Sequence, residues 1–287
     1  MSARAEPELS GETRLVSDHW TTAITETAPG RIRLRGYPIE QVITRCSYAA
    51  TVWLMLTGEL PDPWQERLLD AALVAGVDHG PQAPSIAGAR MAATCGVGLS
   101  QAVATGVNML GDVHGGAGEA CMQMLAALLD EHPDPETSRA EIASAFGVYR
   151  ASVRYVPGFG HRMHRHDPRR DPLMHLVHRA QAAGVVSGRY LRVAEIIEAE
   201  LGRGRSRTVP MNIDGATAVI YSELGFAPEL GKGLFALSRS VGLLAHAYEQ
   251  SREGVRIKGP LPPGVGARYT GPPPRDMPGH ERTVPDA

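Results

Sequence analysis

Apolar residues recur along most of the chain with the spacing of an amphipathic helix. Three stretches show this periodicity most clearly: EACMQMLAALLDEH, LRVAEIIEAEL and ELGKGLFALSRSVGLLAHAYEQ. In the first of them, Met122, Leu125 and Leu129 form one stripe at intervals of three and four residues. Strand-like alternation is confined to GRIRLRGYP, near residues 30–38. We therefore predict an all-α, multi-helical fold with a short N-terminal β-hairpin at most.

Glycine, proline and polar residues interrupt the helical stretches at five places, which predicts loops there. These are PDPW (61–64), GDVHGG (111–116), EHPDPETS (131–138), VPGFGH (156–161) and GRGRSRTVP (202–210). We predict a flexible N-terminus over residues 1–20 and a disordered, proline-rich tail over residues 272–287.

The longest uncharged run extends from Met91 to Gly111, which is long enough to suggest a membrane span. However, it contains Ser100, Gln101 and Asn108 together with four glycines, and few large aliphatic residues. This composition favours a buried, tightly packed helix over a membrane span.

The bulk composition is that of an ordinary globular protein. The chain has 287 residues, of which 43% are apolar and 21% charged, and its formal net charge is −2. This charge argues against a nucleic-acid partner or an anionic membrane surface. The N-terminus lacks the apolar segment of a signal peptide. Cys46, Cys95 and Cys121 form no zinc-binding spacing, so we interpret them as reduced core thiols of a cytoplasmic protein.

The stretch GFGHRMHRHDPRRD, residues 158–171, concentrates three histidines and four arginines. Its glycines allow a ligand to approach the backbone closely. Arg169 stands just after a turn, where its planar guanidinium could bind a carboxylate with two hydrogen bonds. A metal site is the other interpretation of the histidines, but neighbouring arginines repel a cation and no Cys, Asp or Glu completes a ligand set. We therefore predict an anion-binding loop and no metal.

His114 lies in GDVHGGAGEA, among glycines and directly before a strong helix. Backbone N–H groups and the positive end of a helix dipole disfavour an imidazolium there, so a neutral histidine that donates a hydrogen bond is plausible. An incidental histidine in the turn that leads into the helix is an equally good interpretation.

Asp214 lies in PMNIDG, after an apolar approach that could partly desolvate it. Desolvation raises the pKa of a carboxyl group and makes it a better base. Asp-Gly is also a common turn and Asp a common N-cap, and these structural interpretations are the stronger ones for this stretch taken alone.

Taken together, these stretches resemble the citrate synthase superfamily over about residues 21–271. Four further stretches carry the resemblance in the family's order: TTAITETAPGRIRLRGYPIEQV, WLMLTGELP, VDHGPQAPS and SRSVGLLAHAYEQ. The resemblance implies a homodimer with a mobile small domain that closes over its substrates. It also implies carbon–carbon bond chemistry between an acyl-CoA and a 2-oxo acid. The CoA thioester is then a substrate, and neither a metal nor a permanently bound cofactor is expected.

The resemblance also implies roles for individual residues. Asp214 matches the base that takes a proton from the α-carbon of the thioester, and His114 matches the donor to the thioester oxygen. His161 matches the donor to the ketone that becomes the tertiary alcohol. The residues that match the binding site of the oxo acid or its product are His79, Arg169 and Arg239. In the loop that contacts CoA, the matching residues are Val156, Gly158, Gly160, Arg162 and Arg165.

On the same basis we predict the domain organisation. Residues 21–114 and 226–271 form the large helical domain, and residues 115–225 form the small domain.

The chain departs from full-length citrate synthases in ways that resemble citryl-CoA lyase. Only fifteen residues separate GELP (58–61) from VDHG (77–80), and Gly76 replaces a histidine. The C-terminal arginine of the synthases is missing, and Arg256 or Arg268 could replace its carboxylate contact. We predict a citryl-CoA lyase, or an enzyme that cleaves a close analogue. The alternatives are a compact citrate or 2-methylcitrate synthase and an inactive paralogue that acts as a binding subunit.

Overall fold

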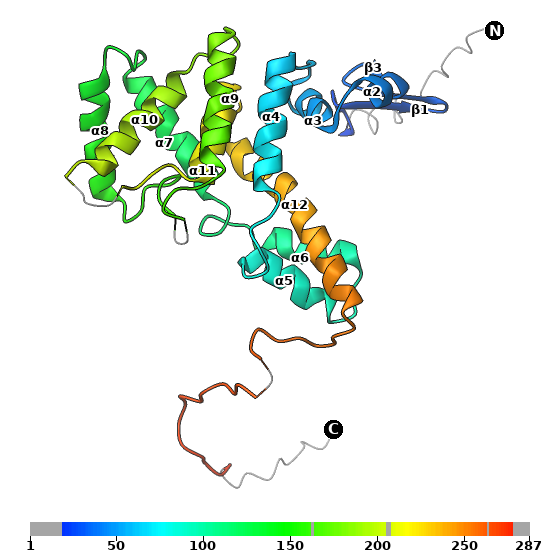
Figure 1. The fold of residues 1–287 in the computed structure, drawn as a ribbon. Coiled ribbons are helices and arrows are strands. Elements are labelled where there is room, and N and C mark those ends of the chain that lie inside the picture. The colour runs from blue at the N-terminus through cyan, green and yellow to red at the C-terminus, as the bar shows by residue number, and fades with distance from the viewer. Residues whose placement is uncertain (1–18, 162–163, 205–207, 263, 278–287) are drawn as a thin grey trace.

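The computed structural model describes residues 19–277, apart from 162–163, 205–207 and 263. Figure 1 shows the elements in their order along the chain. They are β1 (Thr25–Ala28), β2 (Arg31–Leu34), β3 (Tyr37–Pro38), α2 (Ile39–Arg45), α3 (Tyr48–Thr57), α4 (Pro63–Gly76), α5 (Pro84–Ala93), α6 (Leu99–Asn108), α7 (Ala117–Glu131), α8 (Arg139–Ser152), α9 (Arg170–Ala182), α10 (Arg189–Gly202), α11 (Ile213–Glu223) and α12 (Glu229–Arg252). The predicted helical fold is confirmed.

The predicted hairpin is also confirmed. β1 and β2 pair antiparallel, with Thr25 opposite Leu34, and the two-residue strand β3 extends the sheet beside β2. The strand β1, with the sequence TETA, precedes the alternating stretch from which the hairpin was predicted.

The described residues of the predicted breaks lie at helix ends or in the connections between helices. At PDPW, Asp62 caps α4 by accepting hydrogen bonds from the N–H groups of Trp64 (2.7 Å) and Gln65 (2.9 Å). The side chain of Gln65 in turn accepts from the N–H of Asp62 (2.8 Å), and Pro63 occupies the first helical position. This capping box satisfies backbone donors that would otherwise have no partner.

Buried side chains form two hydrophobic clusters of unequal size. The larger unites α3, α4 and α7–α11 with the first half of α12, and includes the fully buried Leu125 and Leu234. The smaller consists of Ala83, Ile86, Ala89 and Leu243, where α5 and α6 pack on the second half of α12. The long helix α12 therefore joins the two clusters (Figure 1). The division into a large domain and a small domain stays a prediction.

The expectation for the longest uncharged run was wrong in detail. The run from Met91 to Gly111 is not one buried helix, because α5 ends at Ala93 and α6 begins at Leu99. Gly96 lies between them with a φ of 83°, which breaks the helix. Many side chains of this run are exposed. In the described part of the chain, no helix is both long and apolar enough to cross a membrane.

The cysteines are not all core residues. Cys121 is fully buried, but Cys46 is half-buried and Cys95 is exposed beyond the end of α5. The predicted flexible N-terminus lies outside the described residues except for residues 19–20. In the predicted tail, the described residues 272–277 are exposed and belong to no helix or strand.

Two loop segments distant in sequence lie side by side and position the predicted site. The N–H of Gly160 donates to Pro210 O (2.7 Å), and the N–H of Asn212 donates to Gly158 O (3.0 Å). A side chain at Gly158 would come within 2.7 Å of Cys121 Sγ, and one at Gly215 would overlap Gly158 O. Glycine is therefore required on both sides of this crossing.

Gly215→Ala should destabilise the protein because its methyl group has no space at the crossing. We expect a loss of about 1–3 kcal/mol in the free energy of unfolding, as for other overpacked interiors. Gly147→Ala is the matched control, because a Cβ at this exposed position of α8 meets no atom within 4 Å. Replacing a helical glycine there should raise stability by up to about 1 kcal/mol. Urea unfolding of both variants measures the two effects, and equal effects would contradict the close crossing.

Candidate active site

One cavity of about 520 Å³ brings together six of the residues predicted for catalysis and substrate binding. These six are His79, His114, His161, Arg169, Asp214 and Arg239. The remainder of the lining is Gly76, Gln82, Ala83, Pro84, Val113, Gly115, Ala117, Gly160, Ile213 and Phe235. The lining comes from segments spread over more than half of the chain, so the cavity exists only in the folded protein.

His114 is held in one orientation from both sides. Its carbonyl oxygen accepts a hydrogen bond from the N–H of Gly111 (2.8 Å), which closes the loop before α7. Its ring nitrogen Nε2 accepts from the backbone N–H of Ser85 (3.1 Å), and Ser85 Oγ is 2.9 Å away. A nitrogen that accepts from a backbone N–H carries no hydrogen, so the neutral ring carries its hydrogen on Nδ1. This geometry is compatible with the expected neutral donor. The backbone N–H that binds the ring, however, belongs to Ser85 in the first turn of α5 and not to α7.

His161 and His79 lie against each other in the cavity. Their ring centroids are 5.4 Å apart with an edge-to-face angle of 76°. The N–H of His164 donates to Nδ1 of His161 (3.1 Å), which leaves the hydrogen of a neutral ring on Nε2. Burial, reinforced by the positive charge of Arg169, lowers the pKa of His79 below its usual value. His79 is therefore a neutral hydrogen-bonding group at neutral pH.

Arg169 is held by a buried carboxylate. Asp167, which is 1% exposed, accepts hydrogen bonds from Arg169 Nε (2.9 Å) and Nη2 (2.8 Å). It also accepts from the backbone N–H of Ile213 (3.1 Å), at the start of α11. Burial alone would raise the pKa of Asp167, but the hydrogen bonds and charge of Arg169 outweigh it and lower the value to about 2. Asp167 thus ties the guanidinium to the helix that carries Asp214.

Arg239 is the second cation of the cavity. It is 4% exposed, its Nε donates to Gly76 O (3.1 Å), and its guanidinium lies 4.8 Å from the ring centroid of Phe235. Burial lowers the pKa of Arg239, but an arginine stays charged at neutral pH. Two guanidiniums that share a cavity attract a ligand with more than one carboxylate.

Asp214 belongs to the first turn of α11, but it is not the cap of that helix. Asn212 is the cap, because its Oδ1 accepts from the N–H groups of Asp214 (2.9 Å) and Gly215 (3.2 Å). In the described ranges, no hydrogen bond to the carboxylate of Asp214 is found. Burial raises its pKa against the opposing charges of Arg169 and Arg239. A carboxyl group with a raised pKa that faces a cavity can exchange protons with a ligand.

Of the described residues predicted to contact CoA, only Gly160 lines this cavity. Val156 packs against the core, Gly158 is buried at the crossing, and Arg165 is exposed. Arg162 lies outside the described residues. Arg256 and Arg268 belong to the exposed C-terminal segment and do not line the cavity. Their contribution to binding stays a prediction.

The other histidines of residues 158–171 have further contacts. His164 lies against His161, with ring centroids 4.6 Å apart, and His166 Nε2 lies 2.9 Å from Asp171 Oδ2. Among the described residues, no group of three histidine, cysteine or acidic side chains is arranged to hold a metal ion.

Three residues of the site were missed by the sequence analysis: Ser85, Asp167 and Asn212. Each of them acts through a backbone N–H or a neighbouring side chain. Its role therefore depends on which parts of the chain come together in the folded protein. The sequence did contain partial signals. Asp167 stands two residues before Arg169, and Asn212 stands two residues before Asp214, a spacing typical of an N-cap.

Comparison with known proteins relates this arrangement to one family. A sequence profile described as "Citrate synthase, C-terminal domain" matches residues 61–260. The chain is 32% identical to citrate synthase of Deinococcus radiodurans, over 78% of this chain and 56% of that protein. It is 28% identical to 2-methylcitrate synthase of Mycobacterium tuberculosis, over 79% of this chain and 55% of that protein. The chain thus spans about half the length of the curated relatives it matches.

Among solved structures, one of similar length matches almost end to end. Citryl-CoA lyase from Hydrogenobacter thermophilus is 33% identical to the chain, with a TM-score of 0.79. The match covers 90% of this chain and 97% of the lyase.

The pair formed by Asp167 and Arg169 predicts a specific pH dependence. Because the folded-state pKa of Asp167 lies below its unfolded value, its stabilising effect is complete above about pH 4 and is lost as the pH falls through about 2. Asp167→Asn should therefore lower the free energy of unfolding by about 2 kcal/mol at pH 7, and the deficit should shrink only below about pH 4.

Urea unfolding of the wild type and the variant between pH 7 and pH 2.5, to the extent that both stay folded, measures this deficit. Asp70→Asn on the exposed surface of α4 is the control, with an expected change within about 0.5 kcal/mol. A deficit that disappears between pH 7 and pH 5 would show that Asp167 is not the strongly acidic group described above.

Proposed function

This chain belongs to the citrate synthase family, and from that premise we propose that it cleaves citryl-CoA, or a close analogue, to acetyl-CoA and oxaloacetate. The observation that carries the proposal is the similarity to citryl-CoA lyase, which combines a TM-score of 0.79 with 33% sequence identity. The substitution of Gly76 for a histidine and the short link between GELP and VDHG support the same assignment.

The proposed cleavage involves two proton transfers, one to His161 and one from Asp214, and proton exchange with solvent resets both groups before the next turnover. His161 takes the proton of the tertiary alcohol, the bond between the alcohol carbon and the α-carbon breaks, and the electrons pass into an enolate of acetyl-CoA. Asp214 then gives its proton to the enolate carbon. Cleavage must start with Asp214 protonated, and the burial that raises the pKa of Asp214 favours that form.

His114 supplies the stabilisation that the enolate needs. The α-proton of a thioester is a weak acid, so a donor must face the oxygen that becomes negative. With Nε2 accepting from Ser85, we assign the Nδ1–H of His114 as the donor to this oxygen. Arg169 and Arg239 bind the carboxylates of the oxo acid portion, and His79 adds a neutral hydrogen bond.

The binding assignments complete the proposal. CoA is a substrate and contacts the segment from Val156 to Arg165, and no cofactor stays bound between turnovers. A homodimer is proposed from the family resemblance, and the exposed apolar side chains of Val241, Leu244 and Tyr248 on α12 would suit a subunit contact. We also propose a cytoplasmic location.

The tautomer of His161 favours a second candidate, a compact citrate or 2-methylcitrate synthase. With the N–H of His164 donating to Nδ1, the neutral ring carries its hydrogen on Nε2, which is the donor form used to protonate a ketone during condensation. Cleavage uses the opposite tautomer, so the ring would have to give up the contact with His164 first. The sequence similarity to synthases is compatible with this alternative.

Two incubations distinguish the candidates. When the enzyme is supplied with citryl-CoA, it should form acetyl-CoA and oxaloacetate. Chromatography of the CoA esters measures this reaction. The enzyme supplied with acetyl-CoA or propionyl-CoA plus oxaloacetate should release no free thiol. Thiol release together with citrate or 2-methylcitrate would reject the lyase in favour of the synthase. Absence of turnover in both incubations would reject both assignments.

Asp214→Asn should lower kcat by at least about 100-fold, because the amide keeps the shape of the side chain but cannot exchange the proton. Asp70→Asn makes the same chemical change on the exposed surface of α4 and should leave kcat unchanged. Steady-state rates of all three proteins provide the comparison. A rate within about threefold of wild type in Asp214→Asn would remove the proposed role.

A further inference from the structure

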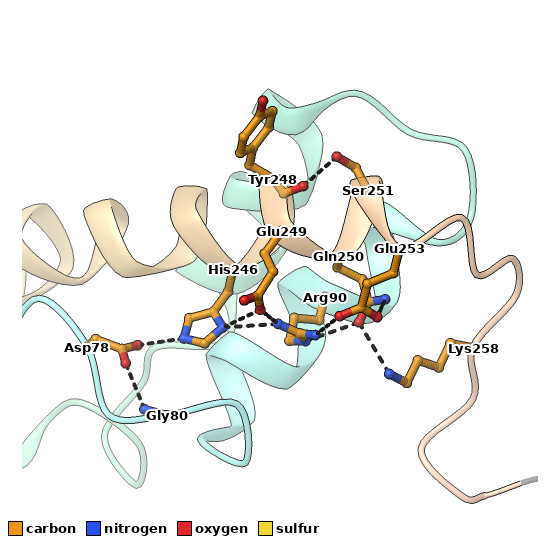
Figure 2. Close-up of polar contacts among 10 residues, drawn as sticks. All are labelled: Asp78, Gly80, Arg90, His246, Tyr248, Glu249, Gln250, Ser251, Glu253 and Lys258. Carbon is orange, nitrogen blue, oxygen red and sulfur yellow. Dashed lines mark hydrogen bonds and ion pairs between the residues drawn. The ribbon is translucent and has the colours of Figure 1, made fainter.

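A line of polar contacts leads from the wall of the cavity to the end of α12. Figure 2 shows it, starting at Asp78 and passing through His246 to Arg90 and the acidic side chains of the last helical turns. Asp78 precedes the cavity residue His79 directly in the sequence. The described contacts therefore connect a substrate-facing segment to groups that do not line the cavity.

Asp78 shapes the turn that carries His79. Its Oδ2 accepts a hydrogen bond from the N–H of Gly80 (3.0 Å), and Gly80 adopts a φ of 83°, which suits glycine. The carboxylate thus closes a short loop around His79. If the carboxylate rotates, this hydrogen bond is lost and the backbone of His79 is no longer held.

His246 is the group that faces the other oxygen of Asp78. Asp78 Oδ1 is shielded from solvent, and no well-aligned hydrogen bond reaches it from the described residues. The polar group in contact with it is His246 Nε2, at 3.2 Å. The helix lies directly on this segment, because a side chain at Gly242 would overlap Val77 O. α12 therefore brings His246 against Asp78 with no intervening layer.

Arg90 determines which nitrogen of His246 carries the hydrogen. Its Nη1 lies 3.2 Å from His246 Nδ1 (Figure 2), and a guanidinium can only donate. Nδ1 therefore accepts, and the hydrogen of the ring is on Nε2, directed at Asp78. Arg90 is held in turn by Gln250 Oε1 (3.1 Å), Glu253 Oε1 (2.9 Å) and the carboxylate of Glu249. Its side chain is only 14% exposed.

We propose that His246 is a positioning residue for His79. Arg90 keeps the hydrogen of His246 on Nε2, this N–H fixes the carboxylate of Asp78, and Asp78 fixes the turn that presents His79 to the ligand. The inference rests on the proposed function in one respect, which is that the carboxylates of the substrate bind in the cavity beside His79. His246 itself does not line the cavity.

A purely structural role of His246 makes a different prediction. If His246 served only to pack α12 on α5, an apolar side chain of similar size at this position would leave KM unchanged. If its N–H positions Asp78, an apolar residue leaves a shielded carboxylate oxygen without its donor. The resulting error in the placement of His79 would weaken substrate binding more than it slows proton transfer by Asp214.

Three substitutions separate the two nitrogens of His246. Gln can place an N–H where Nε2 lies, so His246→Gln keeps the contact with Asp78. The shorter side chain of Asn reaches only as far as the position of Nδ1. His246→Asn therefore keeps an acceptor for Arg90 but loses the contact with Asp78. Leu offers neither group. The control is His178→Asn, which changes an exposed histidine of α9 that does not line the cavity.

We expect His246→Asn and His246→Leu to raise KM for citryl-CoA by about 5- to 30-fold, with a smaller effect on kcat. His246→Gln and His178→Asn should stay within about threefold of wild type. The midpoint of thermal unfolding is measured for each variant, so that a loss of folding is recognised. The inference is overturned if His246→Gln and His246→Leu have the same KM, whether that value is raised or normal.

A second readout separates this inference from the proposed function. If the wild type turns over neither citryl-CoA nor its products, the proposed function fails, and the ring of His79 is then observed by NMR in protein with ¹³C-labelled histidine. Its ring signal, assigned with His79→Gln, should shift in His246→Asn and His246→Leu but coincide with wild type in His246→Gln. An unchanged signal in all three variants would overturn the positioning role without reference to activity.

Discussion

At Gly158 and Gly215 two backbone segments touch with no space for a side chain, and the arrangement of the cavity depends on this contact. The crossing places the start of α11, with Asp214, against the loop that continues into His161. Backbone hydrogen bonds from Gly160 to Pro210 and from Asn212 to Gly158 fix the register of the two segments. Asp167 adds a third link by binding both Arg169 and the N–H of Ile213. An acid, an imidazole and a guanidinium are therefore oriented by one local contact.

The other side of the cavity is built on α12 and α5. Arg239 and His246 are separated by two turns of α12 and lie on the side of the helix that faces residues 76–79. Ser85, in the first turn of α5, directs His114, and Arg90 further along α5 directs His246. One short helix thus sets the hydrogen positions of two histidines by backbone and guanidinium donors. The charges of this cavity suit a ligand with several carboxylates, whereas burial lowers the pKa of His79 and favours its neutral form.

The sequence predicted the helices and the residues of the cavity, but not the contacts that orient them. Periodicity is a local property, so EACMQMLAALLDEH was correctly predicted as a helix, and the Gly-Pro-rich breaks were found for the same reason. His114 and Asp214 were ambiguous as single motifs, and only the order of all motifs indicated that they act together. Ser85 was missed because its partner His114 lies 29 residues away, and the link from Asp167 to Ile213 was missed because it spans 46 residues. The break at Gly96 and the exposure of Cys95 were missed because an uncharged run does not show which of its sides is buried.

The central claim is that this cavity binds an oxo acid between Arg169 and Arg239, with the reacting carbon of a CoA thioester next to Asp214. A crystal structure of the protein with CoA and oxaloacetate tests it most directly. The account predicts the carboxylates of oxaloacetate on the two guanidiniums, its ketone oxygen facing His161, and the thiol end of CoA beside Asp214 and His114. Oxaloacetate bound outside the cavity, or a CoA thiol remote from Asp214, would contradict it.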